Sequence, residues 1–258
     1  MTKRVRAKKY LGQHFLKDES VCQLIAGSLT GHNGYKKVIE IGPGTGAITK
    51  YLVEEDHDLS VVEVDGESIV YLREHYPDLK IIDFNFLKLD LEAYAEGEQI
   101  GLVGNFPYFI SSQILFKIYE NKHIVSESIG MFQKEVAMRV TEKSGSKTYG
   151  ILSVLMQAFY DIEYLKTVEG SAFIPPPKVQ SGIIRLKRNK VEKLDCDEKL
   201  FKIVVKMGFN QRRKTLRNSL KAILPDEIRA NEIFNKRPEQ LGVDSFVDIC
   251  LMIEKYSS

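Results

Sequence analysis

The segment Gly104-Asn105-Phe106-Pro107-Tyr108 combines groups suited to chemistry on an aromatic amine. The lone pair of such an amine is delocalised into its ring, so the nitrogen reacts poorly until acceptors draw on its hydrogens and make it pyramidal. The Asn105 side-chain oxygen and a main-chain carbonyl held by Pro107 could be these acceptors, and Tyr108 could stack on the base. The segment is a candidate catalytic loop for methyl transfer, although such a run can also be an ordinary turn.

A glycine-rich loop, Gly-Pro-Gly-Thr-Gly at 42–46, follows an apolar stretch and precedes a helical pattern. Glycines at this point let the backbone turn tightly and approach a ligand, and we expect Gly42 and Gly44 to contact a cofactor. The loop also satisfies a loose dinucleotide fingerprint with Gly42, Gly44 and Ala47. A nicotinamide dehydrogenase is therefore an alternative, as is a plain turn between strand and helix.

Two acidic residues end the next two apolar stretches. Glu63 comes 21 positions after Gly42, where a carboxylate can accept both hydroxyls of a ribose. Asp83 ends the third stretch and could accept from the amino group of an adenine. Together with the glycine loop they predict a nucleoside site, with no residue suited to a pyrophosphate.

The elements that must position these residues alternate in type. We expect strands at 38–41, 59–64, 79–82, 100–104 and 128–132, with helices at 67–75 and 112–120. This βαβ alternation predicts an α/β fold with a mostly parallel sheet covered on both faces. After a helix at 150–159, two closing strands at 160–168 and 181–187 could pair antiparallel at one edge.

The pattern becomes helical after residue 197. Leu200, Ile203, Val204 and Met207 have the spacing of a helix face. Asn210 can cap a second helix, on which Leu216, Leu220 and Ile223 would form the apolar stripe and Lys214, Arg217 and Lys221 the opposite face. We therefore expect two domains: residues 1–190, beginning with a basic arm at 1–10, and a small helical domain at 191–258.

Basic residues are clustered, although the net charge is only +2, from 37 basic and 35 acidic residues. The stretch 199–225 holds eight basic residues and no acid. Two further clusters comprise Lys3, Arg4, Arg6, Lys8 and Lys9, and Arg185, Lys187, Arg188 and Lys190. Clusters of this kind in a near-neutral chain favour a surface that binds phosphates.

Composition limits the class of protein. With 258 residues, 43% hydrophobic and 28% charged, the chain can bury a large core. Its three cysteines, Cys22, Cys196 and Cys250, are odd in number and lack metal-ligand spacing, so we expect neither a disulfide framework nor a metal site. Nothing resembles a membrane span or a signal peptide. We expect a cytoplasmic protein with no membrane partner.

Five motifs, taken together, resemble one enzyme family. The chain is similar to the ribosomal RNA adenine dimethyltransferases of the KsgA (RsmA) family over nearly its whole length and in the same order. The glycine loop is shared by many methyltransferases, whereas the amino-terminal and proline motifs and the arginine-rich segment are more specific. The motifs are Gly-Gln-His-Phe-Leu at 12–16, Glu-Ile-Gly-Pro-Gly-Thr-Gly at 40–46, Asn-Phe-Pro-Tyr at 105–108, Phe-Ile-Pro-Pro-Pro-Lys-Val at 173–179 and Gln-Arg-Arg-Lys-Thr-Leu-Arg at 211–217.

The resemblance implies a Rossmann-like class I methyltransferase domain followed by a small all-α domain. It implies transfer of methyl groups from S-adenosylmethionine to two adjacent adenosines near the 3′ end of small-subunit (16S) ribosomal RNA, each amine receiving two. The partner would be the small-subunit RNA or the pre-30S subunit during ribosome biogenesis, and we expect the enzyme to act as a monomer without a metal. The helical domain would recognise RNA through Arg212, Arg213, Lys214, Arg217 and Lys221.

Site residues carry over from the family position by position. Tyr108 and Phe173 would sandwich a flipped target base, although Phe173 could equally be a core aromatic that anchors the proline loop. Three positions depart from the common pattern, Phe106, Phe109 and Gln180, and leave the width of the pocket open. The cofactor contacts would be His14, Leu16, Gly42, Glu63, Asp83 and Asn105, the last lying between cofactor and target.

Two further alternatives remain beside the dehydrogenase. One is a relative of the Erm type that methylates large-subunit RNA, against which the basic helix at 211–217 and the segment Arg237-Pro238-Glu239 favour the small-subunit branch. The other is a non-catalytic factor of ribosome assembly that has kept the fold. An intact loop at 105–108 argues against loss of catalysis.

Overall fold

The computed structural model describes residues 5–256, which form two compact units. The first unit comprises Met1–Met138 and Asp161–Arg188, and the second comprises Arg139–Tyr160 and Asn189–Ser258. The segment 139–160 groups with the carboxyl-terminal residues, and the division into functional domains at residue 190 remains a prediction. Of the predicted basic arm, Lys3 and Arg4 lie outside the described residues.

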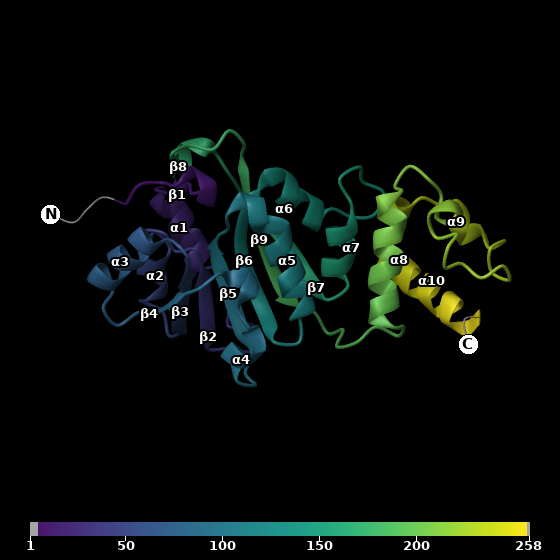
Figure 1. Ribbon diagram of the computed structural model, residues 1–258, viewed down its shortest axis with the longest axis horizontal. Helices are drawn as coiled ribbons and strands as arrows, with labels where there is room; N and C mark the ends of the chain where they lie inside the picture. The colour runs from purple at the N-terminus through teal and green to yellow at the C-terminus, as the bar shows by residue number, and fades with distance from the viewer. Residues whose placement is uncertain (1–4, 257–258) are drawn as a thin grey trace. The chain divides into compact units, whose positions relative to one another are not determined.

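A seven-stranded sheet forms the centre of the first unit, in the order β4-β3-β2-β5-β6-β9-β7 (Figure 1). Strands β4, β3, β2, β5 and β6 are parallel, whereas β9 runs antiparallel to β6 and β7 lies beside β9. A mostly parallel sheet with an antiparallel strand near one edge was predicted from the sequence. The strand bounds are β2 Lys37–Ile41, β3 Asp58–Glu63, β4 Lys80–Asp83, β5 Ile100–Asn105, β6 Val125–Gln133, β7 Tyr160–Val168 and β9 Ser181–Arg188.

The chain order of the sheet reverses between β2 and β5. The chain runs from β2 outward through β3 and β4 and then returns to β5 on the other side of β2. In open α/β sheets, ligands bind outside the carboxyl ends of the strands at such a point. Gly42 follows β2 there and Asn105 ends β5, so two distant motifs meet at one place. At Gly104, an added Cβ would lie 2.6 Å from the Ile41 carbonyl oxygen, which shows how closely the two strand ends approach.

Helices cover the sheet, and acidic residues cap several of them. The Asp18 carboxylate accepts from the amides of Ser20 and Val21 at the start of α1, and Asp65 accepts from Glu67 at the start of α3. Strand β2 is buried at every position because it has covered faces on both sides. The helices of the first unit are α1 Glu19–Ala26, α2 Thr49–Leu52, α3 Gly66–His75, α4 Leu91–Ala95, α5 Ser111–Glu120 and the first part of α6 Lys134–Thr141. Short 3-10 turns are η1 Lys9–Leu11, η2 His32–Gly34, η3 Phe86–Lys88, η4 Tyr108–Ile110 and η5 Gly170–Ala172.

A separate two-stranded sheet joins the amino-terminal motif to the proline motif. Strand β1 (Phe15–Leu16) pairs antiparallel with β8 (Phe173–Ile174), with Leu16 opposite Phe173 (Figure 1). The Lys17 amide extends this pairing by donating to the Ala172 carbonyl at 2.9 Å. Segments far apart in sequence are thereby fixed beside each other at the ligand edge of the main sheet.

The second unit is helical, as predicted, but its basic segment is not a long helix. Helix α8 (Glu198–Asn210) ends at Asn210, which therefore does not cap a following helix. The next helix, α9, is only Leu216–Ser219, with Thr215 before it. Residues 211–214 form turns, so Lys214 and Lys221 lie outside any helix. The other elements are α7 Ile151–Gln157, η6 Glu232–Asn235, η7 Pro238–Gln240 and α10 Val243–Tyr256.

The buried face of α8 also differs from the predicted one. Its buried residues are Phe201, Val204, Val205 and Gly208, whereas Ile203 is 48% exposed. Gly208 lets the helix approach its neighbours, because a Cβ there would lie 3.1 Å from Leu216 and 3.3 Å from Pro238. The buried face of α8 therefore lies about one position later in the sequence than predicted, with only Val204 shared between the two.

Candidate active site

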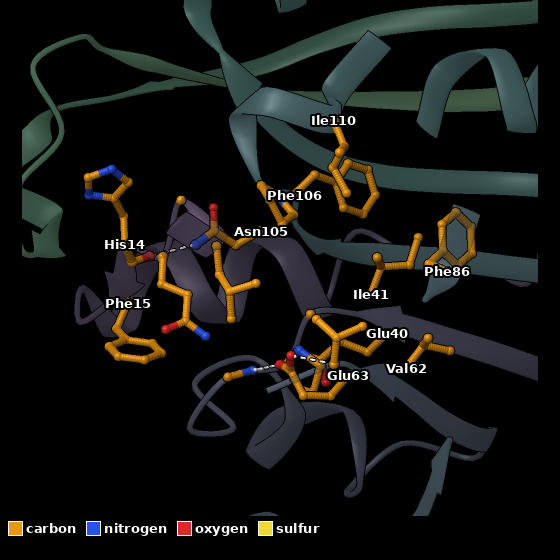
Figure 2. A pocket seen from close by; sticks show the side chains of 18 of the residues that line it. His14, Phe15, Glu40, Ile41, Val62, Glu63, Phe86, Asn105, Phe106 and Ile110 are labelled. Atoms are coloured by element: carbon orange, nitrogen blue, oxygen red, sulfur yellow. Dashed lines mark hydrogen bonds between the residues drawn. The ribbon is translucent and has the colours of Figure 1, made fainter. Parts of the chain in front are cut away.

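A cavity of about 340 Å³ lies at the point where the order of the strands reverses. Figure 2 shows it extending from His14 and Asn105 at one end to Glu40 and Glu63 at the other. The segments after β2, β3, β4 and β5 line it, together with the amino-terminal residues 10–16. The structure therefore brings together the glycine loop, Glu63, His14, Leu16 and the candidate catalytic loop in one cavity.

The glycine loop has the backbone conformation that its composition suggests. Gly42, Gly44 and Gly46 have φ values of +67°, +57° and +79°, in the left-handed region that other residues rarely adopt. At Gly44 a Cβ would lie 2.9 Å from the Phe15 ring, so the amino-terminal motif packs directly on the loop. Any side chain at position 44 would push these two segments apart.

Glu63 is buried and organises the backbone around it. Its carboxylate accepts from the amides of Gly44 (3.1 Å), Val64 (2.8 Å) and Asp65 (2.9 Å). Burial raises the pKa of this carboxyl, and the three amides oppose that shift. A carboxylate offers about four acceptor sites. Three are used, so one site on Oε2 remains for a ligand hydroxyl, rather than the two that the sequence suggested.

Glu40 is a second buried acid that lines the cavity, and its spacing in the sequence indicates no role of its own. Thr49 donates its hydroxyl to Glu40 Oε2 at 2.6 Å. Complete burial raises the pKa of Glu40 to about 8, and the nearby Glu63 carboxylate adds to the shift. Burial therefore favours the protonated form of Glu40.

Replacing Glu40 with glutamine should change how stability depends on pH. In the wild type the carboxyl ionises near pH 4.5 when unfolded and near 8 when folded. The free energy of unfolding of the wild type, relative to Glu40→Gln, should therefore fall as pH rises through this range, by up to about 1.4 kcal/mol per pH unit. Urea unfolding at pH 5, 6.5 and 8 measures the difference. A constant difference would contradict the raised pKa.

Asn105 is oriented by the amino-terminal motif. Its Nδ2 donates to the main-chain carbonyl of His14 at 2.9 Å, and Figure 2 shows this bond at one end of the cavity. A carbonyl can only accept, so the amide nitrogen must face His14. The Asn105 Oδ1 is consequently the group left to accept a hydrogen from a ligand in the cavity, as the proposed chemistry requires.

Tyr108 and His14 lie together beside Asn105. Their rings are stacked with centroids 5.8 Å apart and planes inclined by 25°. The Tyr108 hydroxyl pairs with Ser181 Oγ at 2.5 Å, and burial raises the pKa of this phenol. His14 Nδ1 donates to the Pro175 carbonyl at 2.7 Å, since that oxygen can only accept. The two rings thus form one wall of the cavity.

Two of the three unusual positions line the cavity. Phe106 is 1% exposed and packs edge-on against Phe132, with centroids 5.0 Å apart. Gly130 makes room for the large ring, because a Cβ there would lie 2.4 Å from Phe106. Phe109 lines the mouth, whereas Gln180 does not line the cavity and instead accepts from Lys134 at 2.8 Å.

The prediction that Phe173 stacks on a target base is contradicted by its position in this structure. Its side chain is 1% exposed, belongs to the hydrophobic core with Leu16, and does not line the cavity. The β1–β8 pairing, which local sequence does not reveal, buries it. The alternative weighed from the sequence, a core aromatic that anchors the proline loop, describes Phe173 here.

Replacing Phe173 with leucine distinguishes these roles. If the ring serves packing, Phe173→Leu should lower the free energy of unfolding by about 1 kcal/mol and leave turnover within about threefold. Thermal unfolding and single-turnover methylation measure the two effects. A stable variant whose turnover fell by more than tenfold would restore the stacking role.

Asp83 lies at the same edge of the sheet but not in the cavity. It is paired in register with Glu63 and is exposed. The residues directly after it, 84–87, line the cavity instead. A contact between Asp83 and an adenine amino group remains a prediction. The apolar residues Phe84 and Phe86 line the cavity and were not predicted from the sequence. Apolar residues directly after a strand-end acid are the signal that could have found them.

The amino-terminal segment is tied to the nucleoside side of the cavity. Asp65, at the start of α3, accepts from the Gln13 side chain at 3.0 Å and pairs with the Lys8 ammonium. Burial tends to raise the pKa of Asp65, but these partners hold it below its usual value. Lys8 belongs to the basic cluster that the sequence suggested for binding phosphates. In the structure it pairs with Asp65 instead and so holds residues 8–14 over the glycine loop.

The proposed RNA-contacting residues differ in what they face. Arg212 donates to the Ser146 carbonyl at 3.2 Å and lies 3.8 Å from the Glu239 carboxylate, so it has structural partners. Arg217 is half-buried, whereas Arg213, Lys214 and Lys221 are exposed. Of the proposed RNA-contacting residues, Arg213, Lys214 and Lys221 are therefore the best placed to contact phosphates.

Residues 5–256 contain neither a metal-binding cluster nor a membrane-spanning helix. No group of three or more His, Cys, Asp or Glu side chains there could hold a metal ion. No helix of this part is long and apolar enough to cross a membrane. Its three cysteines are buried and free.

Comparison with known proteins places the chain in a family. The family model for ribosomal RNA adenine dimethylase matches residues 4–256. The Ribosomal RNA small subunit methyltransferase A of Flavobacterium johnsoniae is 55% identical over 254 residues, 97% of each chain. The protein of that name from Bacteroides thetaiotaomicron is 54% identical over 257 residues, covering 98% of this chain and 96% of its own.

Solved structures agree on the fold. A dimethyladenosine transferase from Plasmodium falciparum has a TM-score of 0.79 at 22% identity, covering 94% of this chain and 98% of its own. The 23S rRNA methyltransferase ErmE has a TM-score of 0.68 at 24% identity, covering 92% and 99%. These matches confirm the Rossmann-like fold, and the family model with the relatives above 50% identity excludes the dehydrogenase alternative. The chain is a member of the ribosomal RNA adenine dimethylase family.

Proposed function

We propose that the chain transfers methyl groups from S-adenosylmethionine to the N6 amines of two adjacent adenosines near the 3′ end of small-subunit ribosomal RNA. The observation that carries the proposal is the orientation of Asn105. Its amide nitrogen is held by the His14 carbonyl, which leaves Oδ1 as an acceptor in a cavity shared with the glycine loop and Glu63. An amine acceptor and a nucleoside site therefore lie in one cavity.

The residues present fit S-adenosylmethionine. Glycines with positive φ allow close approach of the backbone, and Glu63 Oε2 retains a site for a ribose hydroxyl. His14 and Leu16 line the same cavity from the amino-terminal motif. When bound, this donor supplies an electrophilic methyl group on a sulfonium, which a nitrogen lone pair can attack directly.

The chain's own part in the reaction is to prepare the amine. Asn105 Oδ1 would accept one amine hydrogen and thereby localise the nitrogen lone pair. The Pro107 carbonyl already accepts from the Ile110 amide at 3.1 Å, so the Phe106 carbonyl, fixed by the following proline, is the better second acceptor. Tyr108 and His14 would support the base. The methylated nitrogen is strongly acidic and releases its proton to water, so no general base is needed.

The small-subunit substrate is supported by the sequence identity to relatives. The predicted basic helix supports it less, because only the four residues Leu216–Ser219 of that region are helical. Relatives at 54–55% identity over nearly the whole chain carry small-subunit names, whereas the likeness to ErmE, at 24%, reaches the fold alone. We further propose that a monomer acts on the pre-30S subunit in the cytoplasm. The intact Asn105 loop argues against a purely non-catalytic assembly factor.

The test is methylation of separated subunits. The protein is incubated with labelled S-adenosylmethionine and with small or large subunits from a strain that lacks adenine dimethylation. We expect label in small-subunit RNA only. Label confined to large-subunit RNA would instead support the Erm-type alternative, and no label in either would contradict an enzymatic role.

Exposed basic residues of the second unit should contribute to RNA binding. Replacing Arg213, Lys214 and Lys221 together with alanine should remove up to three phosphate contacts. The slope of log affinity against log salt concentration should then decrease by roughly 0.7 to 0.9 per contact, about 2 in all. Binding of small subunits at several salt concentrations measures the slope.

The matched control replaces Lys36, Lys80 and Lys88, exposed lysines of the first unit, with alanine. It removes the same charge but should leave the slope near the wild-type value. S-Adenosylmethionine affinity should be unchanged in both variants. Equal slopes for the two triple variants would show that the three basic residues are ordinary surface charge.

A further inference from the structure

Two large aromatic side chains at the mouth of the cavity are unusually exposed. Tyr10 is 77% exposed and Phe109 is 62% exposed, yet both line the cavity that holds Asn105. Neither has a part in the methyl transfer described above. Large apolar rings grouped beside a binding cavity commonly mark a surface that a ligand covers.

The two rings are presented by adjoining turns. Tyr10 lies in η1 and Phe109 in η4, directly after Tyr108. The contact between the turns is made at Gly12, whose φ is +61° and whose added Cβ would lie 3.0 Å from the Phe109 ring. Tyr108 and Phe109 are neighbours in the same turn but face different surroundings. The Tyr108 hydroxyl contacts the buried Ser181, whereas the Phe109 ring is exposed.

The chemistry of this rim fits a single-stranded nucleotide. Every nucleobase has an apolar face that stacks on aromatic side chains, and the adjoining backbone carries a phosphate. Lys9, next to Tyr10, is exposed and supplies a positive charge beside the rings. A partner protein that binds through apolar contacts alone would not interact with the Lys9 charge. A nucleotide of the RNA substrate therefore fits the rim better.

We propose that Tyr10 and Phe109 form a stacking platform for the base beside the target adenine. This inference rests on the proposed function, since it takes the occupant from the same RNA. The target enters the cavity towards Asn105, and the neighbouring base remains outside on the exposed rings. Because the two target adenosines are adjacent, one of them would occupy the platform while the other reacts.

The first test compares alanine and ring-preserving variants. Tyr10→Ala and Phe109→Ala should each raise the KM for under-methylated small subunits by about tenfold. Tyr10→Phe and Phe109→Tyr should recover the affinity that the alanine variants lose. Val53→Ala, an exposed apolar change elsewhere in the first unit, is the control. Calorimetry with S-adenosylmethionine should give wild-type affinity for the alanine variants, and an equal loss there would overturn the proposal by assigning the rings to the donor.

The second test uses the RNA itself. Small subunits are reassembled with RNA in which one of the two adjacent adenosines is abasic, and methylation of the remaining adenosine is measured. The wild type should lose about tenfold or more in kcat/KM, and the double variant Tyr10→Ala/Phe109→Ala should lose little further. An abasic effect of equal size in both proteins would overturn the platform. Failure of the wild type to methylate intact subunits would instead overturn the proposed function.

Discussion

Asn105→Ala is expected to reduce the rate of methyl transfer by about 100-fold to 1,000-fold, the range seen when one preorganised hydrogen-bonding group is removed from a transition state. Asn105 Oδ1 is freed for this role because Nδ2 is bound to the His14 carbonyl at 2.9 Å. The acceptor matters most once the nitrogen becomes pyramidal, so turnover should fall far more than substrate affinity. Single-turnover rates with saturating small subunits measure the loss.

Asn85→Ala is the matched control for Asn105→Ala. Asn85 also lines the cavity, but its side-chain oxygen accepts from the Leu87 amide at 2.9 Å and caps the turn η3, so we assign it no part in binding the amine. Turnover of this variant should stay within about threefold of the wild type. Comparable losses in the two variants, or wild-type turnover in Asn105→Ala, would remove Asn105 from the mechanism.

Glu63→Ala should weaken S-adenosylmethionine binding by roughly 10-fold to 100-fold. The variant loses a hydrogen bond to a charged acceptor, worth about 1.5 to 3 kcal/mol. It also leaves the amides of Gly44, Val64 and Asp65 without their acceptor, so the glycine loop loses its support. Calorimetry of the variant and the wild type measures the change in affinity.

Glu74→Ala, an exposed acidic residue on α3, is the control and should bind S-adenosylmethionine as the wild type does. The pH dependence gives a second readout. Burial raises the pKa of Glu63, so donor affinity of the wild type should begin to fall at a higher pH than an ordinary glutamate would give as the solution is acidified. Equal affinity of Glu63→Ala and wild type at neutral pH would show that the ribose site lies elsewhere.

The main sheet and its ligand edge could be predicted from the sequence because their signals are local. The parallel strands β2, β3, β4 and β5 are short runs rich in apolar residues, and their ends are marked by a glycine, an acid or Asn105. Parallel strands present their carboxyl ends at one edge, so these markers had to meet there. The strand bounds differ from the predicted ones by only a few residues.

Contacts between distant segments could not be predicted in the same way. The two-residue strands β1 and β8 are too short to show a pattern, and their pairing decides that Phe173 is buried. The same pairing brings His14 to Asn105 and fixes the amide. The roles of Glu40 and of Lys8 depend likewise on burial and on ion pairing, which residue spacing does not encode.

The basic segment of the second unit shows a different limit. Leu216, Leu220 and Ile223 have helical spacing, but only Leu216–Ser219 is helical. Leu216 and Leu220 are buried although the helix ends, because turns after α9 continue to direct apolar side chains inward. Periodicity therefore identified Leu216 and Leu220 as buried but overestimated the length of the helix, and Ile223 is only half-buried.

The most direct test of the central claim is identification of the modified nucleosides. Small subunits lacking adenine dimethylation are treated with the wild type and S-adenosylmethionine, and their RNA is digested and analysed by mass spectrometry with sequence mapping. We predict N6,N6-dimethyladenosine at two adjacent positions near the 3′ end, formed about 100-fold or more slowly with Asn105→Ala. Methylation of another base, of another position on adenine, or of adenosines elsewhere in the RNA would contradict the account.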